Sequence, residues 1–284
     1  EGLQRLKNLK TVNWLACARV LTREFLEPLS GIQELCLNFV ESFSLSPFPD
    51  AFEGLAQLRE LKLSWPDLVP FDPTCIGSAP RLESVTFSGQ ADAGKFAGAV
   101  KSAPTLSRLT LSGIVSEELK AEHFSKMSQI TSLSLTYSHC PQSLTAQTFE
   151  GLSELEELEL SGYGLTQLPE GLLDPLGKLK KFSLDHTNVK TVPNGLFHQN
   201  PLLAEARLQS SQITELPQAL FAQNQNLEVI SIAENRLLDW PDGTFDNLPK
   251  LKRVWAGGNA LDLEALDYSG KRELFDTLNN LKHN

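Results

Sequence analysis

The sequence contains little of several residue types on which binding sites often depend. Among its 284 residues are four cysteines, five histidines, three tyrosines and one methionine. No run of about 18 uncharged apolar residues occurs, so no transmembrane helix is predicted, and the first residues lack the basic and then apolar profile of a signal peptide. Attachment to a membrane would therefore need a segment outside this chain.

Basic residues are outnumbered by acidic ones, 25 to 35, and the formal net charge is −10. Nucleic-acid binding relies on clustered Lys and Arg side chains that release counterions, so no nucleic-acid partner is expected. The sequence also has no N-x-S/T site for glycosylation. The composition, 41% apolar and 21% charged, is typical of a soluble globular chain and excludes intrinsic disorder and collagen.

Motifs that carry catalysis or metal binding are also missing. The sequence has no H-x-x-x-H spacing, no Gly-rich phosphate loop and no G-x-S-x-G elbow. The cluster of Glu156, Glu157 and Glu159 is interpreted as a solvated acidic patch, because a hydrolytic pair needs one buried carboxylate. The side chains of Asp185 and His186 are expected to diverge at the end of a strand. We therefore predict no enzyme activity, no catalytic residue, no metal site and no cofactor.

The four cysteines do not have the spacing of a zinc site. Cys17 is expected to be a buried thiol, whereas strand alternation places Cys36 on an exposed face. Cys75 and Cys140 fall on connecting segments of different repeats, too far apart for a disulfide bond between them. The pairing of the cysteines otherwise stays open.

One pattern, L-x-x-L-x-L, returns along the sequence at a nearly constant interval. Most intervals are 24 residues, and the others are 23, 25 or 26. A compact two-layer domain has no reason to repeat a pattern at a fixed spacing, whereas each repeat of a solenoid buries its apolar face on the next. The ten clear copies begin at Ile32, Leu58, Leu82, Leu106, Ile130, Leu155, Leu179, Leu203, Leu227 and Leu251, and a weaker copy begins at Leu9.

A second apolar position lies six residues before these anchors and is expected to form an internal spine. Between strand and spine, segments such as Val192–Phe197 contain Pro, which fixes φ, and Gly, which relaxes it, so they are expected to form the outer bend. That signature is absent from Ala91–Val100, where we predict a short outer helix rather than a linker. The spine phenylalanines are Phe52, Phe124, Phe149, Phe197, Phe221 and Phe245.

The pattern resembles the leucine-rich repeat, in the 24-residue class with L-P-x-G-L-F on its outer side that is typical of extracellular and cell-surface proteins. The resemblance implies an α/β fold, a right-handed solenoid (horseshoe) with a concave parallel β-sheet and an irregular or short-helical convex side. We predict that residues 1–284 form a single array of about eleven repeats plus a partial twelfth, cut within repeats at both ends. The four-cysteine caps usual in such extracellular arrays are missing.

The ninth position of this repeat class normally holds Asn, whose buried amide bonds to neighbouring backbone groups. Only Asn235 and Asn259 keep this residue, so we expect the first half of the chain to be the less regular half. Ser, Thr and Cys can donate hydrogen bonds there more weakly. The other copies hold Cys17, Val40, Pro66, Gln90, Ile114, Ser138, Tyr163, Thr187 and Ser211.

The concave sheet face is the surface expected to bind a partner. With the anchor as position one, positions three, five and seven point out of the sheet. Position five is a column of mostly small hydroxyls, flanked by Phe39 and Trp65 near one end and by Arg253 near the other. Alternatively, Ser and Thr merely suit an exposed strand, and Trp255 covers a neighbouring repeat. The candidate ligand-binding residues are Lys62, Thr86, Thr110, Ser134, Glu159, Ser183, Arg207 and Trp255.

Two consecutive copies, Leu196–Leu203 and Leu220–Leu227, look most like those of invertebrate Toll-type receptor ectodomains. This resemblance implies a non-catalytic, extracellular or cell-surface recognition module of innate immunity or development. Through its concave face or an edge it would bind a protein ligand such as a cytokine-like protein, and it would form a homodimer or a heterodimer. Two alternatives stay open: a soluble secreted leucine-rich repeat protein that binds an immune complex or the matrix, and a non-catalytic subunit of an enzyme complex.

Overall fold

The structure, a computed structural model, describes residues 8–16, 22–39, 49–65, 71–114, 119–125, 127–137 and 144–262. The chain divides into two compact units. The first consists of Glu1–Ser116 and Glu122–Thr136, and the second of Glu117–Ala121 and Tyr137–Asn284. In both units each described copy of the sequence pattern contributes one strand.

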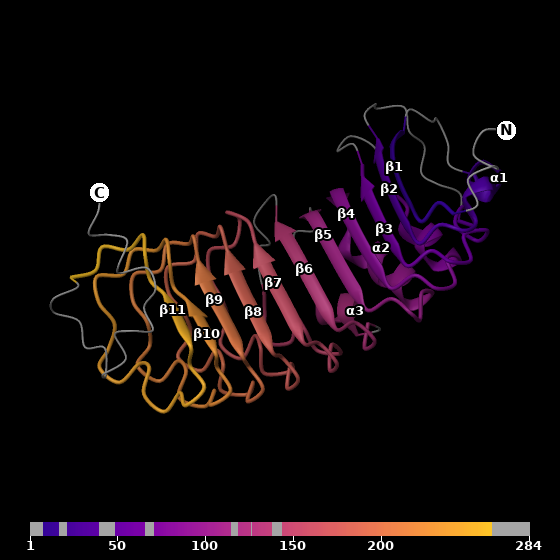
Figure 1. The fold of residues 1–284 in the computed structure, drawn as a ribbon. Coiled ribbons are helices and arrows are strands. Elements are labelled where there is room, and N and C mark those ends of the chain that lie inside the picture. The colour runs from indigo at the N-terminus through magenta and orange to yellow at the C-terminus, as the bar shows by residue number, and fades with distance from the viewer. Residues whose placement is uncertain are drawn as a thin grey trace. The chain divides into compact units, whose positions relative to one another are not determined.

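The first unit contains parallel strands that lie side by side in chain order (Figure 1). They are β1 (Thr11–Ala16), β2 (Glu34–Phe39), β3 (Glu60–Ser64), β4 (Ser84–Ala91), β5 (Arg108–Ile114) and β6 (Ser132–Tyr137). Each residue pairs with its equivalent in the next repeat, so Asn13 pairs with Cys36, and Lys62 pairs with Thr86. Because strand side chains alternate between two faces, this register lines up the apolar residues of successive repeats on the inner face.

Short helices connect the strands of this unit. They are α1 (Arg23–Leu26), η2 (Glu27–Leu29), η3 (Pro73–Ser78), α2 (Ala93–Lys101) and α3 (Ala121–Phe124). The Asp92 side chain caps α2 by accepting a hydrogen bond from the Lys95 backbone N–H at 3.1 Å. The helix predicted for Ala91–Val100 is therefore confirmed, and it buries Phe96 and Val100. At nine residues α2 is the longest helix in the described part of the chain, too short to cross a bilayer.

The second unit has five parallel strands and, over residues 144–262, turns in place of helices. The strands are β7 (Glu157–Ser161), β8 (Lys181–Asp185), β9 (Glu205–Gln209), β10 (Val229–Ser231) and β11 (Arg253–Trp255). At position eight, after the strand, the backbone takes a positive φ, for example 51° at His186, 49° at Ser210 and 55° at Glu234. This left-handed residue turns the chain out of the sheet and into the connecting segment.

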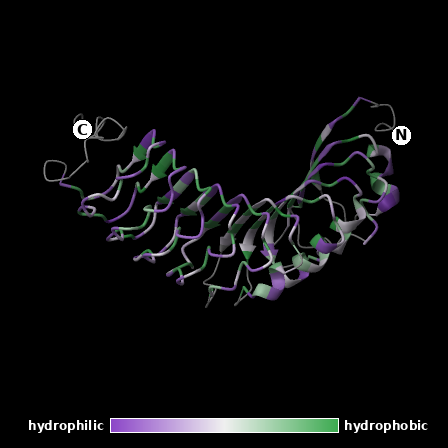
Figure 2. Ribbon diagram, turned by 90° about the horizontal axis from the view of Figure 1, so that it is seen from below, coloured by the Kyte–Doolittle hydropathy of each residue, from purple (hydrophilic) through white to green (hydrophobic). Residues whose placement is uncertain are grey.

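The predicted spine is confirmed in both units. Phe52 and Phe149 are fully buried, and in the second unit the rings of Phe197, Phe221 and Phe245 follow one another with centroids 5.9 and 6.4 Å apart. Figure 2 shows hydrophobic and hydrophilic residues alternating along the chain in each unit rather than gathering in one segment. Every repeat therefore contributes a few apolar side chains to an interior that its neighbours complete.

Position nine satisfies backbone groups in the second unit, as predicted. The Asn235 amide donates to the Ile232 carbonyl at 3.1 Å, and its oxygen accepts from the Ile213 N–H at 3.1 Å. Thr187 and Ser211 continue the row through a hydroxyl–hydroxyl bond of 2.7 Å.

Position nine is less regular elsewhere. In the first unit Ile114 is buried, Gln90 is exposed, and the pairing of β4 with β5 shifts register after Ser88, in line with the irregularity expected for the first half. In the second unit Tyr163 is exposed. Cys17, Val40, Pro66 and Ser138 lie outside the described residues.

A second row of asparagines, not expected from the repeat pattern, lies at the spine. Asn200 and Asn224 are fully buried three residues before their anchors. The Asn200 amide donates to the carbonyls of Leu173 and Leu176, both at 2.9 Å, and the Asn224 amide donates to those of Phe197 and Asn200, both at 3.0 Å. Each amide thus binds two carbonyls of the preceding repeat. These carbonyls also accept backbone N–H groups within their own turns, so the amide adds a second donor to each and ties one repeat to the next.

Replacing Phe197 by Ala should lower the free energy of unfolding by about 3–5 kcal/mol, because its ring is fully buried against Phe182 and Phe221. Denaturant unfolding followed by circular dichroism measures the change. Leu202→Ala, at a side chain that is 45% exposed, serves as the control and should cost about 1 kcal/mol or less. Equal losses in the two variants would contradict a stacked spine.

Replacing Asn200 by Asp keeps the shape of the side chain but exchanges the donor amide for a carboxyl that faces two carbonyl oxygens. Burial and these oxygens should raise the pKa of the new carboxyl above its ordinary value of about 3.9. The destabilisation should therefore be largest at neutral pH. It should shrink as the pH falls toward that ordinary value, because the unfolded state then takes up the proton that the folded state already holds.

The measurement is the difference in urea midpoint between Asn200→Asp and the wild type, taken at several pH values between about 4 and 8. Asn194→Asp, at an exposed position in the same repeat, is the matched control and should show almost no difference at any pH. A loss in Asn200→Asp that does not change with pH would contradict the buried amide contacts.

Candidate recognition surface

The open sheet face, defined here as the side chains at positions three, five and seven of the strands, carries all eight candidate residues. In the first unit Lys62 on β3, Thr86 on β4 and Thr110 on β5 are paired neighbours in the fifth-position column. Ser134 occupies the same position on β6. Lys62 is exposed and the three hydroxyl residues are half-buried, so small polar groups form the accessible floor of this part of the face.

The other candidate residues form the equivalent column of the second unit. Glu159 pairs with Ser183, Ser183 with Arg207, Arg207 with Ser231, and Ser231 with Trp255. Glu159 is exposed, while Ser183, Arg207 and Trp255 are half-buried. The structure therefore brings the candidates together as two groups of four, one in each unit.

Lys62 is held by its neighbour on the same strand. Its ammonium group lies 2.8 Å from Glu60 Oε1, and this hydrogen bond raises the pKa of Lys62 above its ordinary value. Cys36, the next residue in the column, is a half-buried free thiol that accepts a hydrogen bond from the Asn38 amide at 3.6 Å. Cys36 was predicted to lie on an exposed face, and its side chain is only partly exposed.

Cys75 is the other described free cysteine. It is fully buried on η3, and burial raises the pKa of its thiol to about 12, so the thiol is unreactive at neutral pH. Cys17 and Cys140 lie outside the described residues.

Trp255 is part of a cluster with two arginines. The guanidinium carbon of Arg207 lies 5.8 Å from the centre of the Trp255 ring, and that of Arg253 lies 5.3 Å from it. Arg207 also pairs with Glu205 on its own strand. A cation over an indole ring is a favourable contact, and Trp and Arg are the residue types enriched at interface hot spots.

The prediction that Phe39 and Trp65 are exposed anchors beside the fifth-position column is wrong. Phe39 and Trp65 are only 7% and 4% exposed. Their rings lie 4.6 Å apart, and Trp65 continues into Phe71 at 5.1 Å. Both residues occupy position eight, where strand alternation directs the side chain inward, and burying large rings in this aromatic cluster stabilises the first unit.

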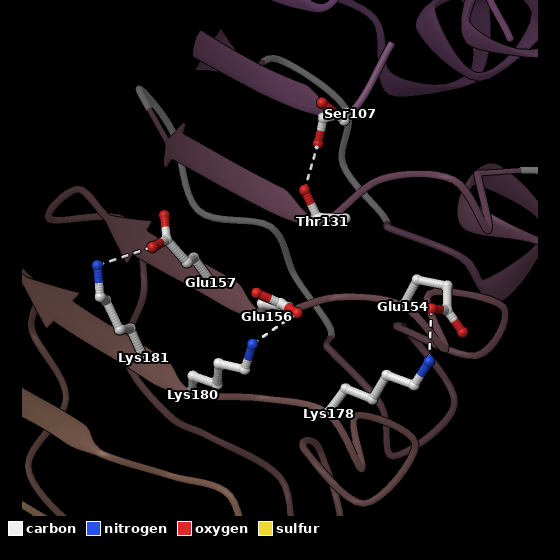
Figure 3. Close-up of polar contacts among 8 residues, drawn as sticks. All are labelled: Ser107, Thr131, Glu154, Glu156, Glu157, Lys178, Lys180 and Lys181. Atoms are coloured by element: carbon white, nitrogen blue, oxygen red, sulfur yellow. Dashed lines mark hydrogen bonds and ion pairs between the residues drawn. The ribbon is translucent and has the colours of Figure 1, made fainter. Parts of the chain in front are cut away.

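Two residues of the predicted acidic patch, Glu156 and Glu157, are paired with lysines of the next repeat, as is the neighbouring Glu154 (Figure 3), while Glu159 is exposed. Lys178, Lys180 and Lys181 lie 2.5, 2.7 and 2.8 Å from Glu154, Glu156 and Glu157, respectively. The hydrogen bond to Glu157 raises the pKa of Lys181. The carboxylates are about half exposed, as a solvated patch requires, but each has a cation 24 residues further along the chain.

A similar pair lies three repeats further on, where Lys252 approaches Glu228 to 2.6 Å and lowers the pKa of that carboxyl. Opposite charges at the same repeat position, 24 residues apart, were the sequence signal that could have predicted these contacts. Each such exposed pair contributes little to stability.

The expected divergence of Asp185 and His186 is wrong. His186 Nδ1 lies 3.0 Å from Asp185 Oδ2, because the positive φ of His186 breaks the alternation of the strand and turns the ring back toward its neighbour. The Tyr163 ring meets the His186 ring edge-on at 6.3 Å. Within the described ranges no group of three or more His, Cys, Asp or Glu residues could hold a metal ion.

Part of the chain matches a known family of repeats. Residues 116–254 match the family described as BspA type leucine-rich repeat region, in six copies. No curated protein matches the sequence.

Solved structures share the fold. A chain in the structure of the Toll–Spatzle complex, described as a molecular hub in Drosophila development and innate immunity, has a TM-score of 0.69 and 18% identity to this chain. The similarity covers 89% of this chain and 36% of that one. The predicted α/β leucine-rich repeat solenoid is therefore confirmed, and the chain resembles Toll-type ectodomains in its fold.

Proposed function

We propose that this chain is a non-catalytic recognition module that binds a protein ligand through the open sheet face or an edge of the sheet. The observation that carries the proposal is the fifth-position column in each unit, where residues from successive strands pair in register and the eight candidate residues keep part of their surface accessible. Side chains fixed on strands lose little freedom when a ligand binds, which favours affinity.

The chemistry of the column supports a protein ligand. Thr86, Thr110 and Ser134 are small and polar, so a partner's backbone and side chains could approach closely and form adaptable hydrogen bonds. In the first unit Lys62 adds charge, and in the second unit Arg207 adds charge and Trp255 adds a large apolar surface. Each of these surfaces resembles a protein interface more than a small-molecule pocket.

The narrower part of the proposal is that the chain belongs to the ligand-binding ectodomain of a Toll-like receptor of innate immunity or development, at the cell surface or outside the cell. The fold shared with a chain of the Toll–Spatzle complex supports it. By that similarity, we propose a cytokine-like protein as the partner and a dimer as the active assembly. A full-length gene that encodes a membrane span and a cytoplasmic signalling domain would distinguish a receptor from a secreted protein.

Introducing Glu at both Thr110 and Ser134 should leave the fold intact and weaken binding to a protein partner at least about tenfold, because two larger charged side chains would fill a surface of small hydroxyls. A panel of secreted proteins from the source organism, tested by surface plasmon resonance, supplies the partner. Circular dichroism checks folding.

The matched control introduces Glu at Thr74 and Ser128, which are exposed and lie outside the strands of the first unit. It adds the same charge to the same residue types and should leave the affinity unchanged. A specific partner that binds both double variants as tightly as the wild type would rule out this part of the open sheet face as the binding surface.

A further inference from the structure

The open sheet face of the second unit holds the Arg207 guanidinium in place. Its Nε donates to Glu205 Oε1, and its Nη2 pairs with the same oxygen. The guanidinium also lies beside the Trp255 ring, and the Arg207 side chain is still 42% exposed. Two independent contacts therefore orient this group, while its Nη1 makes no hydrogen bond to any residue that the structure describes.

Ser231 explains how Arg207 on β9 can reach Trp255 on β11. In the register of the strands Ser231 lies between them, and it is only 1% exposed. Two strand spacings separate the backbones of Arg207 and Trp255 by roughly 10 Å. A small side chain on β10 leaves room for the two large ones to meet above it.

Neutral donors lie next to the guanidinium. Gln209 Oε1 accepts a hydrogen bond from Ser231 Oγ at 3.0 Å, which leaves the Gln209 amide nitrogen as a donor on the open face. On the other side Ser183 is the strand partner of Arg207 and contributes a hydroxyl. Asp185, the strand partner of Gln209, is a nearby carboxylate; its Oδ2 pairs with His186, and its Oδ1 is buried without a hydrogen-bond partner among the described residues.

We propose that these residues form a site, called here the Arg207–Trp255 site, that binds a carboxylate side chain of the protein partner beside an aromatic or apolar side chain packed on Trp255. The proposal rests on the proposed function and names the chemistry of the segment that is recognised. The free edge of the planar guanidinium can form two parallel hydrogen bonds to a carboxylate. Glu205 is the positioning residue that holds Arg207.

The two arginines at the Trp255 ring favour an acidic segment, even though the whole chain carries a net charge of −10. Glu205 pairs with Arg207, and Asp185 on β8 is a second carboxylate of this part of the face. A ring flanked by guanidinium groups also offers a flat apolar surface, so a carboxylate next to an aromatic or aliphatic side chain matches the site better than an acidic group alone.

The test selects peptides from a displayed random library on the wild-type chain and measures the affinity of the selected peptides by fluorescence anisotropy. We expect enrichment of Asp or Glu next to Phe, Tyr, Trp or Leu. Affinity should fall at least about tenfold for Arg207→Gln and for Trp255→Ala. Arg207→Lys should not restore it, because an ammonium group cannot make the paired contact.

Arg108→Gln removes another exposed arginine of the open sheet face, in the first unit, and is the matched control that should leave the affinity unchanged. Enriched peptides without acidic residues, equal binding to Arg207→Gln and wild type, or full rescue by Arg207→Lys would each overturn the proposal. Arg207-dependent binding of heparin oligosaccharides without any acidic peptide would also overturn it and would identify a sulfated glycan as the ligand.

The same measurements distinguish failure of the Arg207–Trp255 site from failure of recognition by the open sheet face. Peptides that lose affinity only when Glu is introduced at Thr110 and Ser134 would support recognition by the open sheet face and overturn the Arg207–Trp255 site. A different result is that acidic peptides bind at Arg207, but a protein partner tolerates both Arg207→Gln and the Thr110 and Ser134 changes. This result would support the chemistry of the Arg207–Trp255 site and would show that the site does not recognise that partner.

Discussion

Each repeat of this chain has an apolar face that only the next repeat can cover, and the rest of the structure depends on that contact. Leu58, Phe52 and Phe197 are fully buried because side chains of their own and neighbouring repeats surround them. Burial at fixed intervals sets the strand register, and the register aligns the side chains of the open sheet face. The same burial removes the carbonyls of the outer turns from water, and the buried Asn200 amide gives two of them a second hydrogen bond besides the one from the backbone.

Features that recur at the repeat period could be predicted from the sequence. The strands, the phenylalanine spine and the fifth-position column follow from one register. Features at the strand ends were harder to predict, because the alternation rule fails where the backbone takes a positive φ, as at His186. At Trp65 the rule holds, since position eight points inward, and the prediction of an exposed ring was wrong because it did not apply the rule there. The row formed by Asn200 and Asn224 was missed because asparagine was expected only at position nine.

Stability and recognition occupy different positions of the same strand. Inward residues hold the repeats together, so the outward ones are freer to vary without loss of the fold. Ser231 is an exception, since it points outward and is nonetheless buried beneath its larger neighbours. The placement of candidate residues could be derived from sequence, but the contact between Arg207 and Trp255 could not, because it depends on a small residue on the strand between them.

The ion pairs between the seventh and eighth copies have a consequence for how such an array can change in evolution. Glutamates at 154, 156 and 157 face lysines at 178, 180 and 181, so the two repeats are complementary and not interchangeable. A tandem duplication of the lysine-bearing repeat would place three lysines against three lysines, and a duplication of the glutamate-bearing repeat would do the same with carboxylates. The array therefore has a preferred order at this junction, and it could lengthen there without like-charge contacts only if both repeats were copied together.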